Sequence, residues 1–419
     1  MVGPRFWAAG LVAAAAYGQS AADDKQLIRE LLERLTHLET EVKELKSRAC
    51  ATDAKTAESK PTEPETRPEA ARVEELTHHG GSQVGSAALA PRLNLRGYAD
   101  LGFHATTSPP ATNGFGLGQM DLFITSRLSD RLGVIGELVV EGNERNEVGV
   151  DLERFLLQYR HNDYFNAEVG RYHTPIGYYN TAYHHGTWFQ TALGRPLLFA
   201  FEDSGGPLPV HDVGVSFLGR IPSGPLGLSY TMAIGNGRAY RRRDSEPVQV
   251  NADENNGKAT TFGLTARPSR WPGLEAGASV YRDRLTPEAG PAIRQRILSA
   301  HLVYIRDRVE FLNEAVWMRH SRPSAWGPGG GTSMPAFYSQ LSYRFGAWRP
   351  YFRYEYLNAA ASDPAAGVVL GPNGRLRMGS AGLRYDLAEF AAVKLQWDRL
   401  VRREPGVVHQ GALQLAFTF

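Results

Sequence analysis

Charged and polar side chains alternate with apolar ones along many segments in the second part of the chain. In the segment 119–128, Asp121 and Arg127 alternate with Met120 and Leu122. Because neighbouring side chains of a β-strand point to opposite faces, the charges share one face and the apolar residues share the other. Rows of charge of this kind set the ion preference of water-filled pores. The pore-lining candidates on this face are Arg96, Asp121, Arg127, Glu137, Arg154, Arg344, Arg353, Glu355 and Lys394.

The same charges have an alternative interpretation. Opposite charges on one face can pair as salt bridges that strengthen a barrel wall without selecting ions. Residues 91–419 include 35 basic and 30 acidic side chains, so a preference for anions would need a local arrangement of charge. Both interpretations remain open from the sequence.

The segment 175–209 is a second candidate for function. Structureless loops beyond roughly 15 residues are uncommon and usually have a function. Folded inward, this segment would narrow the pore and place aromatic, His and Arg side chains beside the path. The alternative is an outer lid that packs against neighbouring subunits. The constriction-loop candidates are Tyr178, His184, His185, Trp188 and Arg195.

Residues for catalysis, metal binding or cofactor binding are not recognisable. His184 and His185 have no Cys, Asp or Glu nearby at ligand spacing. The single cysteine, Cys50, excludes a Cys-rich zinc site, an iron–sulfur cluster and a disulfide framework. A hydrolase would need a nucleophile beside a histidine such as His211, and no GxSxG motif is present. We therefore predict no enzyme, no catalytic residues, no metal and no cofactor.

The composition excludes further classes of protein. The chain has 419 residues, of which 42% are hydrophobic and 10% aromatic, and its formal net charge is +2. Beyond a short N-terminal run it has no apolar stretch of roughly 18 residues, which excludes a helical membrane protein. The aromatic content excludes a disordered chain, and the near-neutral charge gives no reason to expect nucleic acid as a partner.

From residue 92 onward the apolar residues recur with a period of two. Near the end of the chain, Leu413, Leu415 and Phe417 alternate with Gln414 and Thr418. Many such strands in series are typical of a membrane β-barrel. The sequence predicts an all-β fold, a sixteen-stranded antiparallel transmembrane β-barrel over residues 91–419. The strands are expected at 93–104, 114–128, 131–142, 150–161, 165–174, 210–220, 226–235, 258–268, 272–283, 294–306, 308–319, 335–346, 348–358, 375–386, 389–402 and 408–419.

The lengths of the connections support this prediction independently. Connections after even-numbered strands are short, as at Ser129 and Asp130, whereas those after odd-numbered strands include 175–209 and 236–257. Outer-membrane barrels have short periplasmic turns and long outer loops. Aromatic residues near strand ends, such as Trp348, suit the two bilayer interfaces. The predicted location is therefore the cell outer membrane.

Residues 1–22 are predicted to be a secretory signal peptide. Arg5 precedes an apolar run that is too short to span a bilayer, and small residues follow it. Cleavage is expected before Gln19 or before Asp23. The alternative is an uncleaved anchor.

Residues 23–50 are predicted to form an α-helical coiled coil in the periplasm. Their apolar residues are spaced alternately three and four apart, which is the heptad pattern. Leu27 and Leu32 widen the apolar stripe and favour a homotrimer. The alternative is an amphipathic helix folded back on its own chain. Residues 51–90, with Pro, Glu, Thr, Ala and Ser, are predicted to be a flexible linker.

Short motifs in the barrel region resemble known families. The segment Leu413–Phe419 is similar to the terminal strand of bacterial outer-membrane proteins. The segments 169–177, 195–199, 212–219 and 234–237 resemble the porin O and P family, the phosphate-selective porins of Gram-negative bacteria. This resemblance implies a sixteen-stranded trimer, with an N-terminal coiled coil in some members.

The lysine content departs from that family, whose members have a lysine-rich entrance. Lys258 and Lys394 are the only lysines in residues 91–419, and arginine supplies the other 33 positive charges. This departure weighs against phosphate as the substrate, although it leaves the passage of anions in general open.

These observations predict an outer-membrane porin for passive diffusion of small hydrophilic solutes, with a preference for anions in an Arg-lined lumen. The expected partners are outer-membrane lipid and lipopolysaccharide. The run Arg241–Arg243 would contact lipopolysaccharide phosphates, unless it is only a solvated charge run. The alternative function is a structural protein that tethers the membrane to the cell wall or a periplasmic partner through its coiled coil.

Overall fold

The structure of the chain is a computed structural model that describes Thr40 and most of residues 92–419. The positions left out of that range are 109–112, 143–146, 184–185, 203–205, 239–251, 254, 288–289, 323–330, 361, 364, 366–373 and 403–405. The predicted signal peptide and linker, and the coiled coil apart from Thr40, lie outside the described residues and stay predictions. No helix in the described part of the chain has the length and hydropathy to cross a bilayer.

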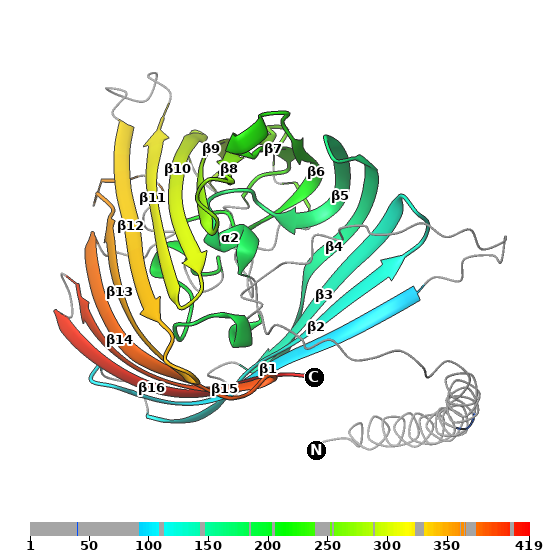
Figure 1. The fold of residues 1–419 in the computed structure, drawn as a ribbon. Helices are drawn as coiled ribbons and strands as arrows, with labels where there is room; N and C mark the ends of the chain where they lie inside the picture. Colours follow the sequence, from blue (N-terminus) through cyan, green and yellow to red (C-terminus); the bar gives the residue numbers. More distant parts are fainter. Residues whose placement is uncertain are drawn as a thin grey trace, which may run out of the picture. The chain divides into compact units, whose positions relative to one another are not determined.

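Sixteen antiparallel β-strands form a closed barrel (Figure 1), which confirms the predicted fold class. The strands are β1 (Arg92–Thr106), β2 (Gly114–Arg127), β3 (Leu132–Gly142), β4 (Val148–Asn162), β5 (Phe165–His173), β6 (His211–Arg220), β7 (Leu228–Gly235), β8 (Ala259–Ala266), β9 (Leu274–Leu285), β10 (Ile293–Arg306), β11 (Val309–Ser321), β12 (Gly331–Tyr343), β13 (Trp348–Asn358), β14 (Arg375–Ala388), β15 (Ala391–Val401) and β16 (Val407–Thr418). Each strand pairs with its neighbours in sequence. The barrel closes where β1 pairs with β16, with Tyr98 opposite Thr418.

The observed strand positions agree closely with the predicted ones. The largest difference is at β12, which begins at Gly331 rather than at 335. The sorting of connections by length is less strict than predicted. Two connections at the short-turn end, 221–227 and 267–273, are longer than two connections at the long-loop end, 143–147 and 402–406. The first of these turns contains the 3₁₀ helix η3 (Gly224–Leu226), which accounts for its extra residues.

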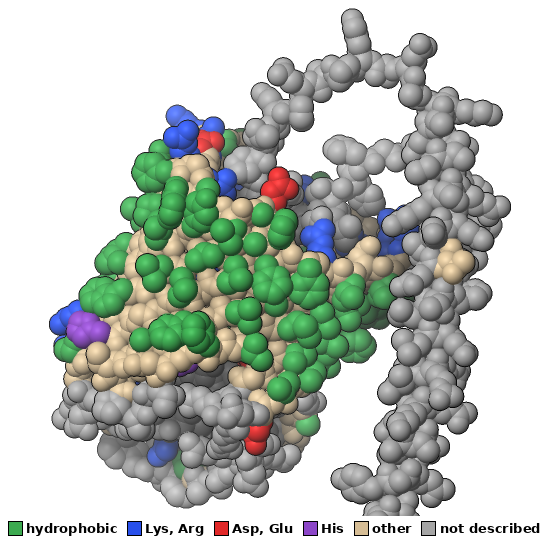
Figure 2. All heavy atoms as spheres, turned by 90° about the horizontal axis from the view of Figure 1, so that it is seen from below, with side chains coloured by type: hydrophobic (Ala, Val, Ile, Leu, Met, Phe, Trp, Pro, Cys, Tyr) green, Lys and Arg blue, Asp and Glu red, His purple; other side chains and the backbone are tan. Residues whose placement is uncertain are grey.

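The two faces of the barrel wall differ in polarity. On β10, Leu298 and Leu302 on the outer face are 57% and 46% exposed, whereas the polar Gln295 and Ser299 lie buried on the inner face. Figure 2 shows one side of the outer wall, where hydrophobic side chains predominate and basic side chains lie mostly at the edges. Soluble monomers rarely expose apolar surface on this scale, so the outer face is suited to lipid.

The connection between β5 and β6, residues 174–210, folds into the barrel (Figure 1) and is called the inner loop below. Its helical turns are α2 (Tyr179–Ala182), η1 (Thr187–Phe189) and η2 (Leu197–Phe199). Apolar side chains of the inner loop, such as Ile176, pack against wall residues such as Tyr338 in the largest hydrophobic cluster. The hydrophobic core of the described chain thus lies inside the barrel, between the inner loop and the wall.

Candidate functional site: the inner loop and the lumen wall

Glu314 on β11 holds the first part of the inner loop. Its carboxylate accepts hydrogen bonds from the backbone N–H groups of Tyr178 at 2.6 Å and Tyr179 at 2.8 Å. The hydroxyl of Tyr338 donates a third bond at 2.7 Å. Glu314 is only 2% exposed, and a buried carboxylate is tolerated only where donors of this kind replace water. The contact therefore fixes the inner loop against the wall beside α2.

An ion pair on β13 holds the middle of the inner loop. Arg353 Nε lies 2.8 Å from Glu355 Oε1, and the two side chains are 1% and 2% exposed. Arg353 Nη1 also donates a hydrogen bond to the carbonyl of Gly194 at 2.9 Å. Glu355 accepts one from the N–H of Leu197 at 2.5 Å. Both side chains lie on the inner face and both bind the inner loop, and their predicted role in lining the pore stays a prediction.

Two basic residues on β14 and β15 hold the inner loop near η1. Lys394 is fully buried, and its Nζ donates to the carbonyl of Thr187 at 2.5 Å. Arg384 Nη1 donates to the carbonyls of Trp188 at 2.6 Å and Gln190 at 3.1 Å. Carbonyl oxygens thus replace the hydration of both cations. The predicted Lys394 lies on the lumen wall beneath the inner loop, and Arg384 is a functional candidate that the sequence analysis did not single out.

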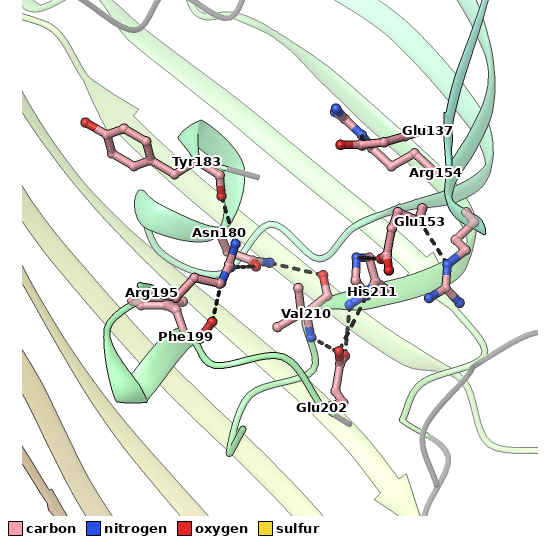
Figure 3. Close-up of polar contacts among 11 residues, drawn as sticks. Glu137, Glu153, Arg154, Asn180, Tyr183, Arg195, Phe199, Glu202, Val210 and His211 are labelled. Carbon is pink, nitrogen blue, oxygen red and sulfur yellow. Dashed lines mark hydrogen bonds and ion pairs between the residues drawn. The ribbon is translucent and has the colours of Figure 1, made fainter. Parts of the chain in front are cut away.

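Arg195 joins distant parts of the inner loop to each other (Figure 3). Its guanidinium donates to the carbonyl of Phe199 at 2.5 Å, the carbonyl of Tyr183 at 3.1 Å and the amide oxygen of Asn180 at 3.2 Å. It also lies 4.2 Å from the ring centre of Phe201, a favourable cation–π distance. Arg195 is one of the predicted constriction-loop residues, and its donors are directed into the inner loop.

A second cluster fixes the end of the inner loop to the wall (Figure 3). His211 Nε2 lies 2.8 Å from Glu153 Oε2, and His211 Nδ1 lies 3.4 Å from Glu202 Oε2. Glu202 also accepts the N–H of Val210 at 2.5 Å. Burial raises the pKa of Glu202, but the hydrogen bond from His211 and the charges of His211 and Arg238 outweigh it, so the pKa is lowered. Glu202 therefore stays charged and bound at neutral pH.

A β-bulge in β4 turns two consecutive charged residues toward the lumen. Glu137 on β3 lies opposite Arg154, and the next residue, Leu138, lies opposite Leu152, so that Glu153 is the extra residue. Arg154 Nε contacts Glu137 Oε2 at 2.5 Å, whereas Glu153 Oε2 lies 2.8 Å from His211 Nε2. A bulge breaks the period of two, which is why sequence alternation predicted Arg154 but missed Glu153.

The other predicted pore-lining residues lie in three settings. The Asp121 carboxyl lies near Glu137 on the inner face and is 3% exposed. Arg96 is exposed and interacts with Tyr98. Arg127 and Arg344 lie at the short-turn end. Arg127 Nη2 pairs with Asp130 Oδ1 at 3.0 Å. The backbone N–H of Arg344 donates a hydrogen bond to the backbone carbonyl of Arg308 at 2.8 Å. Their role in ion passage stays a prediction.

The remaining predicted residues belong to the inner loop. The Tyr178 ring centre lies 5.9 Å from that of His301 on β10, and the Trp188 ring lies 5.8 Å from the guanidinium of Arg384. His184 and His185 lie outside the described residues. Within the described part of the chain, no group of three His, Cys, Asp or Glu side chains is placed to hold a metal ion.

No protein-family model matches the chain, and no curated protein matches it. Solved structures do match it in fold. An anion-selective porin from Comamonas acidovorans matches with a TM-score of 0.56 at 13% identity, over 79% of this chain and 100% of that one. The outer-membrane channel DcaP of Acinetobacter baumannii matches with a TM-score of 0.55 at 10% identity, over 80% and 99%. Salmonella typhi OmpF matches with a TM-score of 0.52 at 14% identity, over 78% and 97%. The chain therefore has the fold of these outer-membrane porins.

Proposed function

We propose that the chain is an outer-membrane porin through which small hydrophilic solutes diffuse passively. The observation that carries this proposal is a closed barrel with an apolar outer face, a polar inner face and one long loop inside it. The first and last strands bring Arg92 and Phe419 to the short-turn end, so that residues 23–90 would lie in the periplasm. The solved structures with the same fold, which are porins, support this function.

The inner loop is proposed to set the width of the path. It contacts β11 through Glu314 and β13 through Arg353. It also reaches β1, where the ring of Phe189 lies 5.0 Å from that of Tyr98. A segment bound at several points around the wall is expected to keep a fixed position during solute passage.

A preference for anions is the finer part of the proposal. Arg154 and Arg160 on the inner face and the likeness to an anion-selective porin support it. The inner face also carries Asp121, Glu137 and Glu168, and several arginines of the barrel lie on its outer face. We therefore expect a weak preference for small anions, without the phosphate selectivity of the porin O and P family.

We also propose a homotrimer in the outer membrane, with lipid around it. The most exposed apolar side chains on the outer face include Phe115 at 88%, Leu117 at 74% and Val148 at 70%, on β2 and β4. Apolar surface this prominent suits contact with a second subunit. Native mass spectrometry in detergent should show a mass three times that of the chain, and a purely monomeric folded protein would contradict the trimer.

Planar-bilayer recordings test the channel itself. Purified, folded protein should insert in discrete conductance steps, and a KCl gradient should give a small reversal potential of the sign expected for anions. A barrel that folds, as judged by circular dichroism, and yet gives no conductance steps would overturn the porin proposal. A reversal potential of the opposite sign would overturn only the anion preference.

A further inference from the structure

The outer face near the long-loop end carries several exposed arginines. Among the described residues, none of them is in ion-pair contact with a carboxylate. They alternate with inward-facing buried residues and share the outer face with exposed apolar residues such as Leu298 and Trp317. These residues are Arg282 and Arg284 on β9, Arg294 and Arg296 on β10, Arg319 on β11, Arg375 and Arg377 on β14, and Arg399 on β15.

Some arginines at the short-turn end differ, because they pair with aspartates. Arg127 lies 3.0 Å from Asp130, Arg220 lies 3.6 Å from Asp163 and Arg306 lies 3.5 Å from Asp307. The described residues thus supply carboxylates to several arginines at the short-turn end and to none of the outer-face arginines named at the long-loop end. The latter are available to an anionic ligand.

Two of these arginines line a recess on the outer face of β13–β15. It has a volume of about 520 Å³, and Gly379 and Ala381 leave it without bulky side chains. Phe352 and Trp397 flank it, and they are 55% and 49% exposed. Arg377 and Arg399 also line it. An adjoining recess of about 550 Å³ shares Arg377 and is lined by Arg375 and Arg402 as well.

The basic and apolar residues of the recess occupy different positions along the strands. On β14, Arg377 lies nearer the long-loop end than Ala381, and on β15 Arg399 lies nearer that end than Trp397. The apolar part of the recess thus lies deeper in the wall and the basic part lies toward its edge. Phosphorylated lipids have the matching order, with acyl chains toward the bilayer centre and phosphates at the surface. Arginine also binds phosphate through two parallel hydrogen bonds.

We propose that this recess binds a phosphorylated, multiply acylated lipid of the outer leaflet, of the chemistry found in lipopolysaccharide. Its phosphates would contact Arg377 and Arg399, and one acyl chain would lie over Gly379 and Ala381. The inference rests on the proposed function, because it requires a barrel in the outer membrane with its long loops outward. It assigns the lipid contact to a site other than Arg241–Arg243, which lie outside the described residues.

The test measures lipid binding to the full-length, detergent-folded protein by native mass spectrometry. The probes are diphosphorylated lipid A, lipid A with its phosphates removed, and phosphatidylethanolamine. Each basic residue near an anionic lipid surface contributes about a fivefold gain in affinity. The double variant R377Q/R399Q should therefore bind diphosphorylated lipid A roughly 30-fold more weakly than the wild type. The matched control R220Q/R306Q, at the short-turn end, should bind it like the wild type.

Three outcomes would overturn the site: equal binding by R377Q/R399Q, equal binding of lipid A without phosphates, or full competition by inorganic phosphate at equal concentration. The last outcome would indicate a site for soluble anions. If R377Q/R399Q does not fold, R377K and R399K keep the charge and should bind with intermediate affinity. Conductance of R377Q/R399Q should match that of the wild type. A failure of the channel proposal would therefore appear in bilayer recordings, and a failure of the lipid site would appear only in lipid binding.

Discussion

The inner and outer faces of β14 and β15 carry the same kinds of basic residue in opposite settings. On the inner face, Arg384 and Lys394 donate to carbonyl groups of the inner loop and are almost fully buried. On the outer face, Arg377 and Arg399 are exposed and lie beside an apolar recess. The two sets also lie at different heights of the wall, because Arg377 and Arg399 are nearer the long-loop end than Arg384 and Lys394. The role of a basic residue in this barrel is thus set by the partners on its face, and its position in the sequence alone does not decide it.

The inner contacts should have the largest effect on stability. In Glu314→Ala, the N–H groups of Tyr178 and Tyr179 and the hydroxyl of Tyr338 lose their acceptor. We expect the free energy of unfolding to fall by about 3 kcal/mol, since buried donors left unpaired are costly. Single-channel conductance should also rise, because the inner loop loses its contact at α2. Urea unfolding and bilayer recordings measure the two effects.

Glu389→Ala is the control for that variant, because Glu389 is exposed in the turn between β14 and β15. It should leave both the unfolding midpoint and the conductance unchanged. A Glu314→Ala protein that behaves like this control would show that the inner loop is held without Glu314.

Charge-reversal variants on the inner and outer faces should differ in their effect on ion selectivity. Arg160 lies on the inner face of β4 and Arg296 on the outer face of β10. Arg160→Glu should shift the reversal potential toward cations by about 10 mV or more, because a charge on the lumen wall changes the potential along the path. Arg296→Glu should cause no such shift. Equal shifts for the two variants, measured in the same KCl gradient, would mean that the faces are assigned wrongly.

A smaller effect is expected where like charges meet on the outer face. Arg296 lies directly opposite Arg282 on one side and Arg319 on the other. Like charges in such pairs are destabilising by roughly 0.2–1 kcal/mol each. In a neutral detergent, Arg296→Gln should therefore raise the free energy of unfolding by about 0.5–1 kcal/mol. Adding a diphosphorylated lipid should remove this advantage, and urea unfolding with and without the lipid decides between the outcomes.

The smallest effect is expected for the pH dependence of the stability that Asp363, in the loop between β13 and β14, contributes. Asp363 accepts hydrogen bonds from His320 Nδ1 at 2.8 Å, Thr332 Oγ1 at 2.9 Å and the N–H of Ala365 at 2.8 Å. Burial raises the pKa of Asp363, but the hydrogen bond and charge of His320 outweigh it, so the pKa is lowered. The stabilisation from a lowered carboxyl pKa is present above its ordinary value of 3.8 and is lost as the pH falls through the folded-state value.

The melting temperature should therefore differ between wild type and Asp363→Asn at pH 6, with the wild type higher. This difference should shrink between pH 4 and pH 2, where the carboxyl becomes protonated. A difference that stays constant over that range would show that the charge of Asp363 is not what stabilises the protein.

The barrel was predictable because its strands repeat a simple rule many times. Alternating residues such as Leu413 and Gln414 place one side chain in lipid and the next in the lumen, so each strand can be recognised locally. The same rule could have placed Arg296 on the outer face, because it has the same parity as Leu298.

The contacts of the inner loop were not predictable in this way. Glu314 and Tyr178 are far apart in sequence, and only the closed barrel brings them together. The inward direction of Glu153 depends on one extra residue in β4, which no alternation reveals. The strands of the wall and several residues of the inner loop were therefore predictable from the sequence. The hydrogen bonds that fix the inner loop became visible only in the structure.

The attachment of the inner loop to both sides of the barrel also has a mechanical consequence. A ring of strands resists stretching along its hydrogen bonds, but by itself it has little to stop it from flattening. Here Thr187 contacts Asp100 at 3.3 Å on one side, while Tyr179 is bound to Glu314 on another. The inner loop thus links two sides of the ring from inside, and in the proposed membrane setting it would resist flattening of the barrel by lateral pressure.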